Sequence, residues 1–178
     1  NPGVPRGLDI DGNGQTDDPG DAWGFGRFPG QYAMLLLSRF PIDEEHARSF
    51  QHFLWSDMPD ALRPVLPDGE DFYPEDTWNR LRLSSKSHWD VPISINGQTI
   101  HFLASHPTPP AFDGPEDRNG ARNHDEIRLW ADYIVPERAH YLVDDGGQTG
   151  GLPGGASFVI AGDLNADMLD GGSRNQAI

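Results

Sequence analysis

The chain contains no cysteine, no long apolar run and only one lysine, Lys86. Without cysteine, disulfide bonds are excluded, although the redox compartment stays open. No apolar run approaches the roughly 18 residues that a membrane-spanning helix needs, so we expect no membrane span.

Basic residues are scarce beside acidic ones: 13 against 28, for a net charge of −15. Because so few side chains could neutralise phosphates, long nucleic acid is disfavoured as a partner but not excluded. The acidic surplus has two explanations that both stay open. It would keep the protein soluble in a salty or calcium-rich medium, or some of the carboxylates would bind metal ions.

The composition still suits a folded domain. With 178 residues, the chain is long enough for one domain with a core, or for part of a larger one. Its 21 glycines and 16 prolines predict short strands joined by long ordered loops. Residues 1–5 resemble an internal loop and residues 174–178 complete no element, so we expect a piece of a longer protein.

Several segments have the residue patterns of β-strands. Apolar runs and alternation predict strands over residues 31–38, 48–55 and 80–85. Asn96-Gly97 lies between the alternating segments 91–95 and 99–104, and this predicts a hairpin because both central residues of a type I′ turn need positive φ. With one strand–helix–strand passage, the pattern predicts a mixed α/β sandwich.

One helix is predicted after a polar loop at residues 105–122. Asn123 is placed to cap it, with Glu126 three residues later as in a capping box, and Pro136 marks its end. An apolar stripe with helical spacing is formed by Ile127, Trp130, Ala131 and Ile134.

Residues 158–167, FVIAGDLNAD, combine a short apolar run with polar side chains at its end. Residues 158–161 suit a buried strand, and Asp163, Asn165 and Asp167 follow. Since side chains alternate along a strand, Asp163 and Asn165 would share one face. A carboxylate and an amide there can hold a water, a metal-bound phosphate or both, although the same residues are also common in turns.

His106 follows the second hairpin strand and precedes Pro107, which stiffens the loop. A histidine at a strand end is well placed to face a cleft, and the alternative is a loop histidine that only bonds the backbone. The polar loop beyond it carries Arg118 and Asn119, which we predict to bind substrate at the rim of that cleft.

Residues 9–21 are similar to an EF-hand-type calcium loop, with alternate oxygen ligands and glycine at the sixth position. Glycine occupies the last ligand position, and no helices flank the loop. The predicted ligands are Asp9, Asp11, Asn13, the Gln15 carbonyl and Asp17, with Asp18 or Asp21 supplying the last carboxylate. A plain Asp/Gly turn is the alternative.

Three segments, in this order, resemble the endonuclease/exonuclease/phosphatase superfamily of Mg²⁺-dependent phosphoesterases. They are QYAMLLLSRFPI at residues 31–42, IHFLASH at 100–106 and FVIAGDLNAD at 158–167. In that family the corresponding segments end in LSR-aromatic-P-I, in a histidine and in GD-x-N. The chain looks closest to bacterial exported members with an Asp-rich insertion, which implies an extracellular or periplasmic location.

The resemblance implies an α+β fold: an α/β/β/α four-layer sandwich of two mainly antiparallel sheets flanked by helices, incomplete in this chain. It also implies in-line attack of water on a phosphoester, with Mg²⁺ or Mn²⁺ at the active site. By motif, Asp163 would orient or deprotonate the water, Asn165 would hold the phosphoryl oxygen or the metal, and His106 would bond a non-bridging oxygen.

Two parts of the family pattern are missing from the sequence: an upstream strand ending in Glu and a downstream Asp-His pair. We therefore expect these residues alone to be inactive and to need the remaining parts of the same protein. The alternative is a non-catalytic, calcium-stabilised extracellular interaction domain. A glycoside hydrolase is a weak third possibility because no two acids are paired at strand ends.

Overall fold

The computed structural model describes residues 2–167, 169 and 174–177. The strands are β1 (Arg48–Ser49), β2 (His88–Ile95), β3 (Gln98–Ser105) and β4 (Ser157–Ala161). The α-helices are α1 (Glu75–Trp78) and α2 (Arg118–Tyr133), and 3₁₀ turns cover Pro19–Asp21, Trp55–Asp57, Ala139–Tyr141 and Arg174–Gln176. The architecture is α+β, as the sequence predicts. No helix in the described part is long and apolar enough to cross a membrane.

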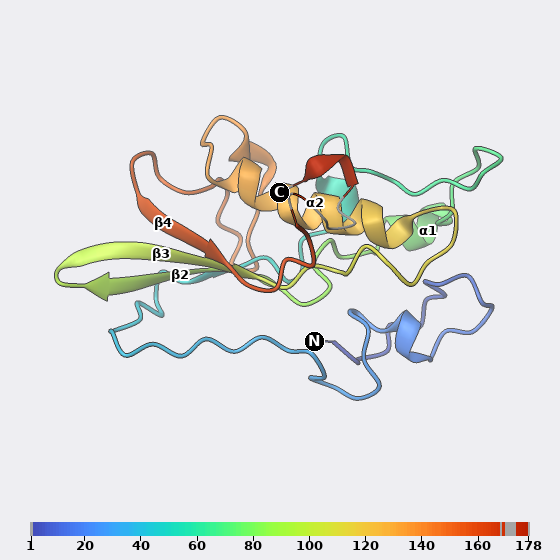
Figure 1. The fold of residues 1–178 in the computed structure, drawn as a ribbon, viewed down its shortest axis with the longest axis horizontal. Coiled ribbons are helices and arrows are strands. Elements are labelled where there is room, and N and C mark those ends of the chain that lie inside the picture. The colour runs from blue at the N-terminus through green and yellow to red at the C-terminus, as the bar shows by residue number, and fades with distance from the viewer. Residues whose placement is uncertain (1, 168, 170–173, 178) are drawn as a thin grey trace.

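The four strands form one mixed sheet in the order β1-β2-β3-β4. β1, β2 and β3 pair antiparallel, whereas β4 runs parallel to β3, with Leu103 opposite Ile160. The long connection between the two parallel strands contains α2, as a parallel pair requires. In Figure 1, α2 runs above the plane of the strands, and the N-terminal residues follow the lower side.

The predicted hairpin is confirmed, and so is a strand over residues 158–161. That strand is not buried as predicted, because Phe158, Val159 and Ile160 are 40%, 48% and 37% exposed. β2 and β3 are joined by Asn96 and Gly97, whose φ angles of 52° and 80° are both positive, as a type I′ turn needs. β4 contains the whole apolar run of residues 158–161. Parallel pairing extends from Ile100 opposite Ser157 to Ala104 opposite Ala161. The C-terminal ends of β3 and β4, each of which is followed by polar residues in the sequence, therefore lie side by side.

Three other predicted strands are largely wrong. Residues 31–38 form no strand in the described structure, and of residues 48–55 only Arg48–Ser49 does. Residues 80–85 contribute one isolated bridge, between Leu54 and Arg82. An apolar or alternating pattern is compatible with a strand, but a strand also needs a hydrogen-bonded neighbour. These segments find one only at Arg48–Ser49 and at the Leu54–Arg82 bridge.

The predicted helix is present but begins earlier than expected, at Arg118. Asn123 is a buried residue inside the helix and does not cap it; its Nδ2 donates to the backbone oxygens of Thr108 and Leu164. The first turns bury polar side chains, so they gave no apolar signal. Ile127 and Trp130 are buried as predicted, whereas Ala131 is exposed.

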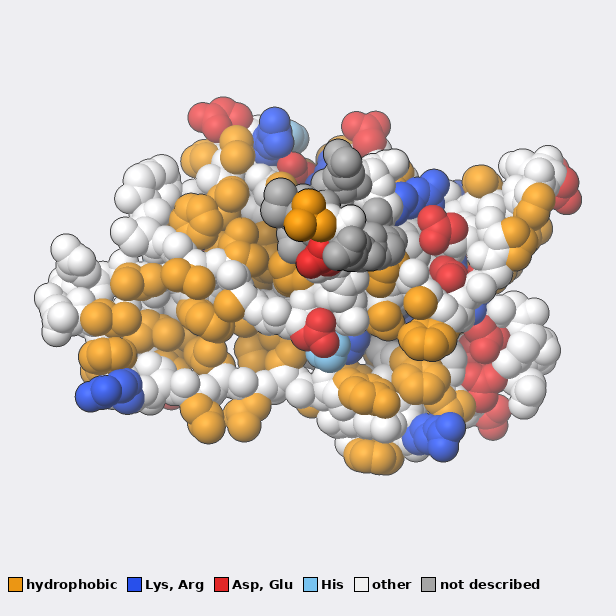
Figure 2. Space-filling view, in the orientation of Figure 1, with side chains coloured by type: hydrophobic (Ala, Val, Ile, Leu, Met, Phe, Trp, Pro, Cys, Tyr) orange, Lys and Arg blue, Asp and Glu red, His pale blue; other side chains and the backbone are white. Residues whose placement is uncertain are grey.

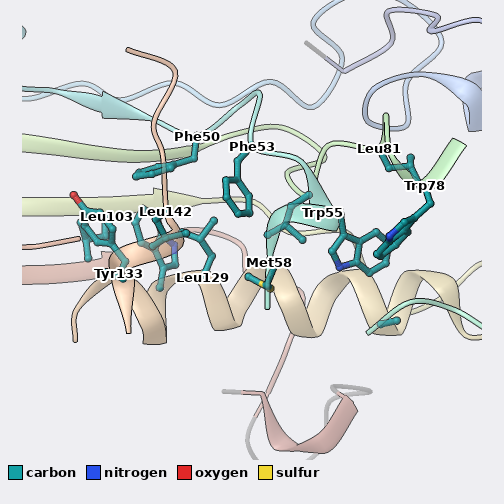
Figure 3. Packing of buried hydrophobic residues seen from close by; sticks show 14 of the residues in the cluster. Phe50, Phe53, Trp55, Met58, Trp78, Leu81, Leu103, Leu129, Tyr133 and Leu142 are labelled. Carbon is teal, nitrogen blue, oxygen red and sulfur yellow. The ribbon is translucent and has the colours of Figure 1, made fainter. Parts of the chain in front are cut away.

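The core lies between α2, one face of the sheet and the long loops around residues 50–83 (Figure 3). It is rich in aromatic side chains: Trp55 packs 5.0 Å from Trp78, and Phe50 meets the edge of Tyr133 at 5.5 Å. The indole nitrogen of Trp55 donates to Asp125 of α2 over 2.7 Å, which satisfies the polar edge of the buried ring. The core thus fixes α2 against the loops that precede β2.

Apolar side chains also remain exposed beside the sheet. Leu35 and Leu37 are 81% and 84% exposed, and Phe158, Val159 and Ile160 of β4 are each more than a third exposed. Figure 2 shows hydrophobic side chains gathered over the strands.

Candidate active site

The parallel pairing of β3 and β4 brings together two of the predicted catalytic residues. His106 directly follows β3, and Asp163 lies two residues beyond β4. His106 Nε2 is 3.8 Å from Asp163 Oδ2, and the two side chains are 24% and 68% exposed. A half-buried imidazole and an accessible carboxylate thus face the same place on the surface.

Gly162 makes this approach possible. Its φ of +144° is one that residues with a side chain rarely adopt, and a Cβ there would lie 1.9 Å from the backbone oxygen of Ser105. The backbone after β4 therefore passes directly against the end of β3. Only glycine allows the two strand ends to come this close.

Asn165, the third predicted residue, lies in the turn after the strand and not on the strand itself. It has a positive φ of 50°, and its amide N–H donates to Asp163 Oδ1 over 3.1 Å. Its side-chain Nδ2 donates to the Pro107 oxygen over 3.0 Å, which ties the turn to the loop after His106. Asn165 thus forms the turn after β4, and no hydrogen bond to its side-chain oxygen is found among the described residues.

The family model for the endonuclease/exonuclease/phosphatase family matches residues 3–178. The chain belongs to this family. No curated protein and no solved structure matches it. Family membership implies metal-dependent hydrolysis of phosphoesters in general. The match identifies no individual site residue, so the catalytic roles of His106, Asp163 and Asn165 stay predictions.

The divalent metal implied by the endonuclease/exonuclease/phosphatase family fits the donors at this edge. Asp163 offers a carboxylate and Asn165 an amide oxygen, and Mg²⁺ is usually held by one or two carboxylates together with substrate phosphates and water. In the described residues, the one group of three acidic or histidine ligands lies elsewhere, at Asp9, Asp11 and Asp21. Among the described residues, Asp163 therefore belongs to no group of three such ligands.

Lys86, which the sequence marks only as the single lysine and as part of a basic cluster with Arg80 and Arg82, lies close to the predicted site. It is 8% exposed, and its Nζ donates to the Pro107 oxygen over 3.4 Å. Burial lowers the pKa of Lys86, while the charges of Glu126 and Asp163 raise it. Burial also lowers the pKa of His106, as does the charge of Lys86, while Asp163 and Glu126 act in the opposite direction. Burial thus lowers the pKa of both groups.

Glu126 is the second residue whose role the sequence did not reveal. It was predicted as a helix-capping partner, but it is buried within α2. Its carboxylate accepts the backbone N–H of Ser85 over 2.7 Å and that of Thr108 over 2.6 Å. One buried anion thus joins the segment carrying Lys86 to the loop that follows His106.

The predicted substrate-binding residues lie in other contacts. Arg118 pairs with Glu116, and its guanidinium lies 5.4 Å from the ring of Phe72. Asn119 donates through Nδ2 to the Ala111 oxygen over 2.7 Å. No hydrogen bond or ion pair in the described structure joins either residue to His106, Asp163 or Asn165. Both therefore stay predictions.

The acidic loop gathers three of its six predicted ligands. Carboxylate oxygens of Asp9, Asp11 and Asp21 lie within 4.8 Å of one another. Asn13 instead bonds within the loop: its Oδ1 accepts the N–H of Gln15 over 2.7 Å. Asp17 is exposed and lies outside the group. The structure thus favours Asp21 over Asp18 as the additional carboxylate.

Proposed function

We propose that this domain hydrolyses a phosphoester by in-line attack of water, with His106, Asp163 and Asn165 as its catalytic residues. The observation that carries the proposal is the 3.8 Å approach of His106 Nε2 to Asp163 Oδ2 at the shared end of β3 and β4. A phosphoryl group placed against both side chains would meet a hydrogen-bond donor and a carboxylate together.

Each residue has a role that its surroundings support. The exposed carboxylate of Asp163 orients the attacking water and takes its proton. His106 donates a hydrogen bond to a non-bridging oxygen as negative charge builds up, and a neutral imidazole can do so through one ring N–H. Asn165 holds the phosphoryl oxygen or the metal through its side-chain oxygen.

Mg²⁺ or Mn²⁺ is the proposed cofactor, and when bound it would stabilise charge on the phosphoryl oxygens. Asp163 and Asn165 would hold it. Lys86 lies beside the site, where its Nζ donates to the Pro107 oxygen in the loop after His106. A small or soluble phosphoester suits the domain better than long nucleic acid, because only 13 basic residues stand against 28 acidic ones.

The four-layer sandwich is also part of the proposal. The exposed apolar side chains of β4, together with Leu35 and Leu37, have the character of a sheet face that a second layer covers. We propose that remaining parts of the same protein supply this layer and further metal ligands. The 178 residues alone would then be inactive.

The second candidate is a non-catalytic, calcium-stabilised interaction domain in an extracellular setting. The group formed by Asp9, Asp11 and Asp21 is the observation that favours it. Such a domain would respond to Ca²⁺ in its stability and would hydrolyse no phosphoester.

The test is hydrolysis of a phosphomonoester and a phosphodiester with Mg²⁺, Mn²⁺ or Ca²⁺, by the 178-residue chain and by a longer protein that contains it. Asp163→Asn should lower the rate of the active form by about 10²-fold or more. The matched control is Asp76→Asn, an exposed carboxylate in α1. A rate for Asp163→Asn within a few-fold of the parent would remove that residue from the mechanism, and no hydrolysis by either protein would favour the second candidate.

A further inference from the structure

We propose that Asp9, Asp11 and Asp21 bind a Ca²⁺ ion that fastens the N-terminal segment to the body of the domain. One carboxylate oxygen from each residue lies within 4.8 Å of the other two. These residues are far from β3 and β4 in sequence, and no described contact joins them to His106 or Asp163. The site is thus separate from the proposed active site.

Asp21 supplies an independent reason to expect a cation. Its side chain is fully buried, and Oδ1 accepts the N–H of Ile10 over 2.7 Å. The other oxygen, Oδ2, is also buried and accepts no hydrogen bond from the residues that the structure describes. A buried carboxylate is costly unless it is paired or binds a metal, so an oxygen left without a donor beside two more carboxylates indicates a missing positive partner.

The nearest arginine does not fill that role. Arg6 donates through Nε to the backbone oxygen of Asp21 over 3.0 Å, and its guanidinium lies 4.9 Å from the centre of the Trp23 ring. Burial lowers the pKa of Arg6, and the charge of Asp21 acts in the opposite direction. Within the described part of the chain, Arg6 Nη1 and Asp21 Oδ2 both lack a hydrogen-bond partner. Asp21 Oδ2 thus receives no hydrogen bond from this arginine or from any other residue that the structure describes.

The ligand chemistry favours Ca²⁺ over Mg²⁺. Ca²⁺ accepts six to eight oxygens in irregular arrangements, whereas Mg²⁺ demands near-ideal octahedral geometry and keeps its waters. The loop curls around Asp9, whose carboxylate accepts the N–H groups of Gly12 and Gly14 over 2.8 and 2.9 Å. Three carboxylates in a loop without flanking helices suggest an affinity near that of extracellular modules, with a dissociation constant of about 10⁻⁴–10⁻³ M.

The ion would stabilise the attachment of the N-terminal segment. Leu8 and Ile10 on one side of the loop belong to the core cluster. On the other side, Trp23 packs under the guanidinium of Arg82 at 3.8 Å. Asp21 joins the two sides through its bond to Ile10. An ion on Asp21 would therefore hold the core side and the Trp23 side together.

The test is a calcium titration of the metal-free full chain, followed by calorimetry and thermal melting. We expect saturable Ca²⁺ binding and a rise in the melting temperature of roughly 1–6 °C at about 1 mM Ca²⁺. Asp9→Asn and Asp21→Asn should each weaken binding at least tenfold. Asp17→Asn removes the same charge from the same loop outside the group, so it should bind as the parent does. Asp9→Asn keeps the test valid if the buried Asp21 variant does not fold.

Four results would overturn the proposal. The first is a parent protein whose melting temperature does not respond to Ca²⁺. The second is a loss of Ca²⁺ affinity in Asp17→Asn equal to that in Asp9→Asn, which would mean that only the net negative charge of the loop matters. The third is equal affinity for Mg²⁺. The fourth is loss of binding in Asp163→Asn with retention in Asp9→Asn, which would place the ion at the active site. Calcium binding and thermal melting are measured without any hydrolysis assay. Failure of the calcium proposal and failure of the proposed function are therefore distinguishable.

Discussion

His106 Nε2 lies 3.8 Å from Asp163 Oδ2, although one residue follows a hairpin strand and the other follows the strand after α2. Their proximity depends on the parallel register of β3 and β4, in which Ala104 is opposite Ala161. Residues that hold this register or the loops beyond it should therefore affect catalysis without touching substrate.

His106→Ala should lower kcat of the active protein by about 10²–10³-fold, because it removes a donor aimed at developing charge. Asp163→Asn acts on the same attack step. The double variant should therefore lose less than the product of the two single losses. Steady-state kinetics of the three variants would measure this, with the exposed His140→Ala as control. Fully multiplicative losses would show that the two residues act independently.

Gly162→Ala should disrupt the meeting of the strand ends. The new Cβ would lie 1.9 Å from the Ser105 oxygen, at a φ of +144°, so the backbone after β4 must move away from His106. We expect a loss of about 1–3 kcal/mol in unfolding free energy and more than tenfold in activity. Denaturant unfolding and kinetics would measure both.

The matched control for that change is Gly155→Ala, in the turn before β4. Gly155 also has a positive φ, of +81°, but a Cβ there would meet nothing within 4 Å. It should cost about 1 kcal/mol and leave kcat unchanged. If both variants lost activity equally, backbone strain in general and not the contact with Ser105 would explain the effect.

The sequence predicted the parts of this fold that depend on local chemistry. Asn96-Gly97 specifies its own turn, and residues 158–161 are apolar enough to specify a strand. Residues 31–38 show the limit: their alternating exposure is typical of a strand, yet no described neighbour pairs with them. Pairing is a long-range property that a local pattern cannot supply.

The candidate site divides in the same way. His106, Asp163 and Asn165 follow predicted strands, so the sequence could place them together once the strands were adjacent. The sequence could not predict the contacts of Lys86 and Glu126. These contacts, to Pro107, Ser85 and Thr108, depend on the packing of α2. From sequence alone, a polar residue buried inside a helix cannot be distinguished from one in a loop or at a helix cap.

Glu126→Gln should weaken both the fold and the site. The change replaces an anion that accepts the N–H groups of Ser85 and Thr108, and hydrogen bonds to a buried charge contribute about 1.5–3 kcal/mol each. We expect a loss of about 2 kcal/mol in stability and a lower kcat, because Thr108 lies in the loop after His106. Glu137→Gln, beyond the end of α2 and exposed, is the control. An unchanged kcat in Glu126→Gln would show that the hydrogen bonds of Glu126 to Ser85 and Thr108 stabilise the fold without affecting catalysis.

His88 should make stability depend on pH. The imidazole is fully buried between Ser84 Oγ, 2.6 Å from Nδ1, and the Glu126 backbone oxygen, 2.7 Å from Nε2. Burial lowers its pKa below the ordinary value of 6.5, while the charge and carbonyl of Glu126 act in the opposite direction. Because the unfolded chain then binds the proton more tightly, the stability that His88 contributes is present above about pH 6.5 and is lost as the pH falls through its folded pKa.

Denaturant unfolding between about pH 7.5 and pH 5 should thus show stability falling by up to about 1.4 kcal/mol per pH unit for this one group. His88→Gln should be less stable at neutral pH, because Ser84 and Glu126 lose their partner, but its pH slope should be shallower. His106→Gln should reduce the pH slope less than His88→Gln does. The pKa of His106 is also lowered, but its side chain is less buried. His140→Gln, on an exposed residue, should keep the parent slope. A slope unaltered by His88→Gln would mean that other groups control the acid response.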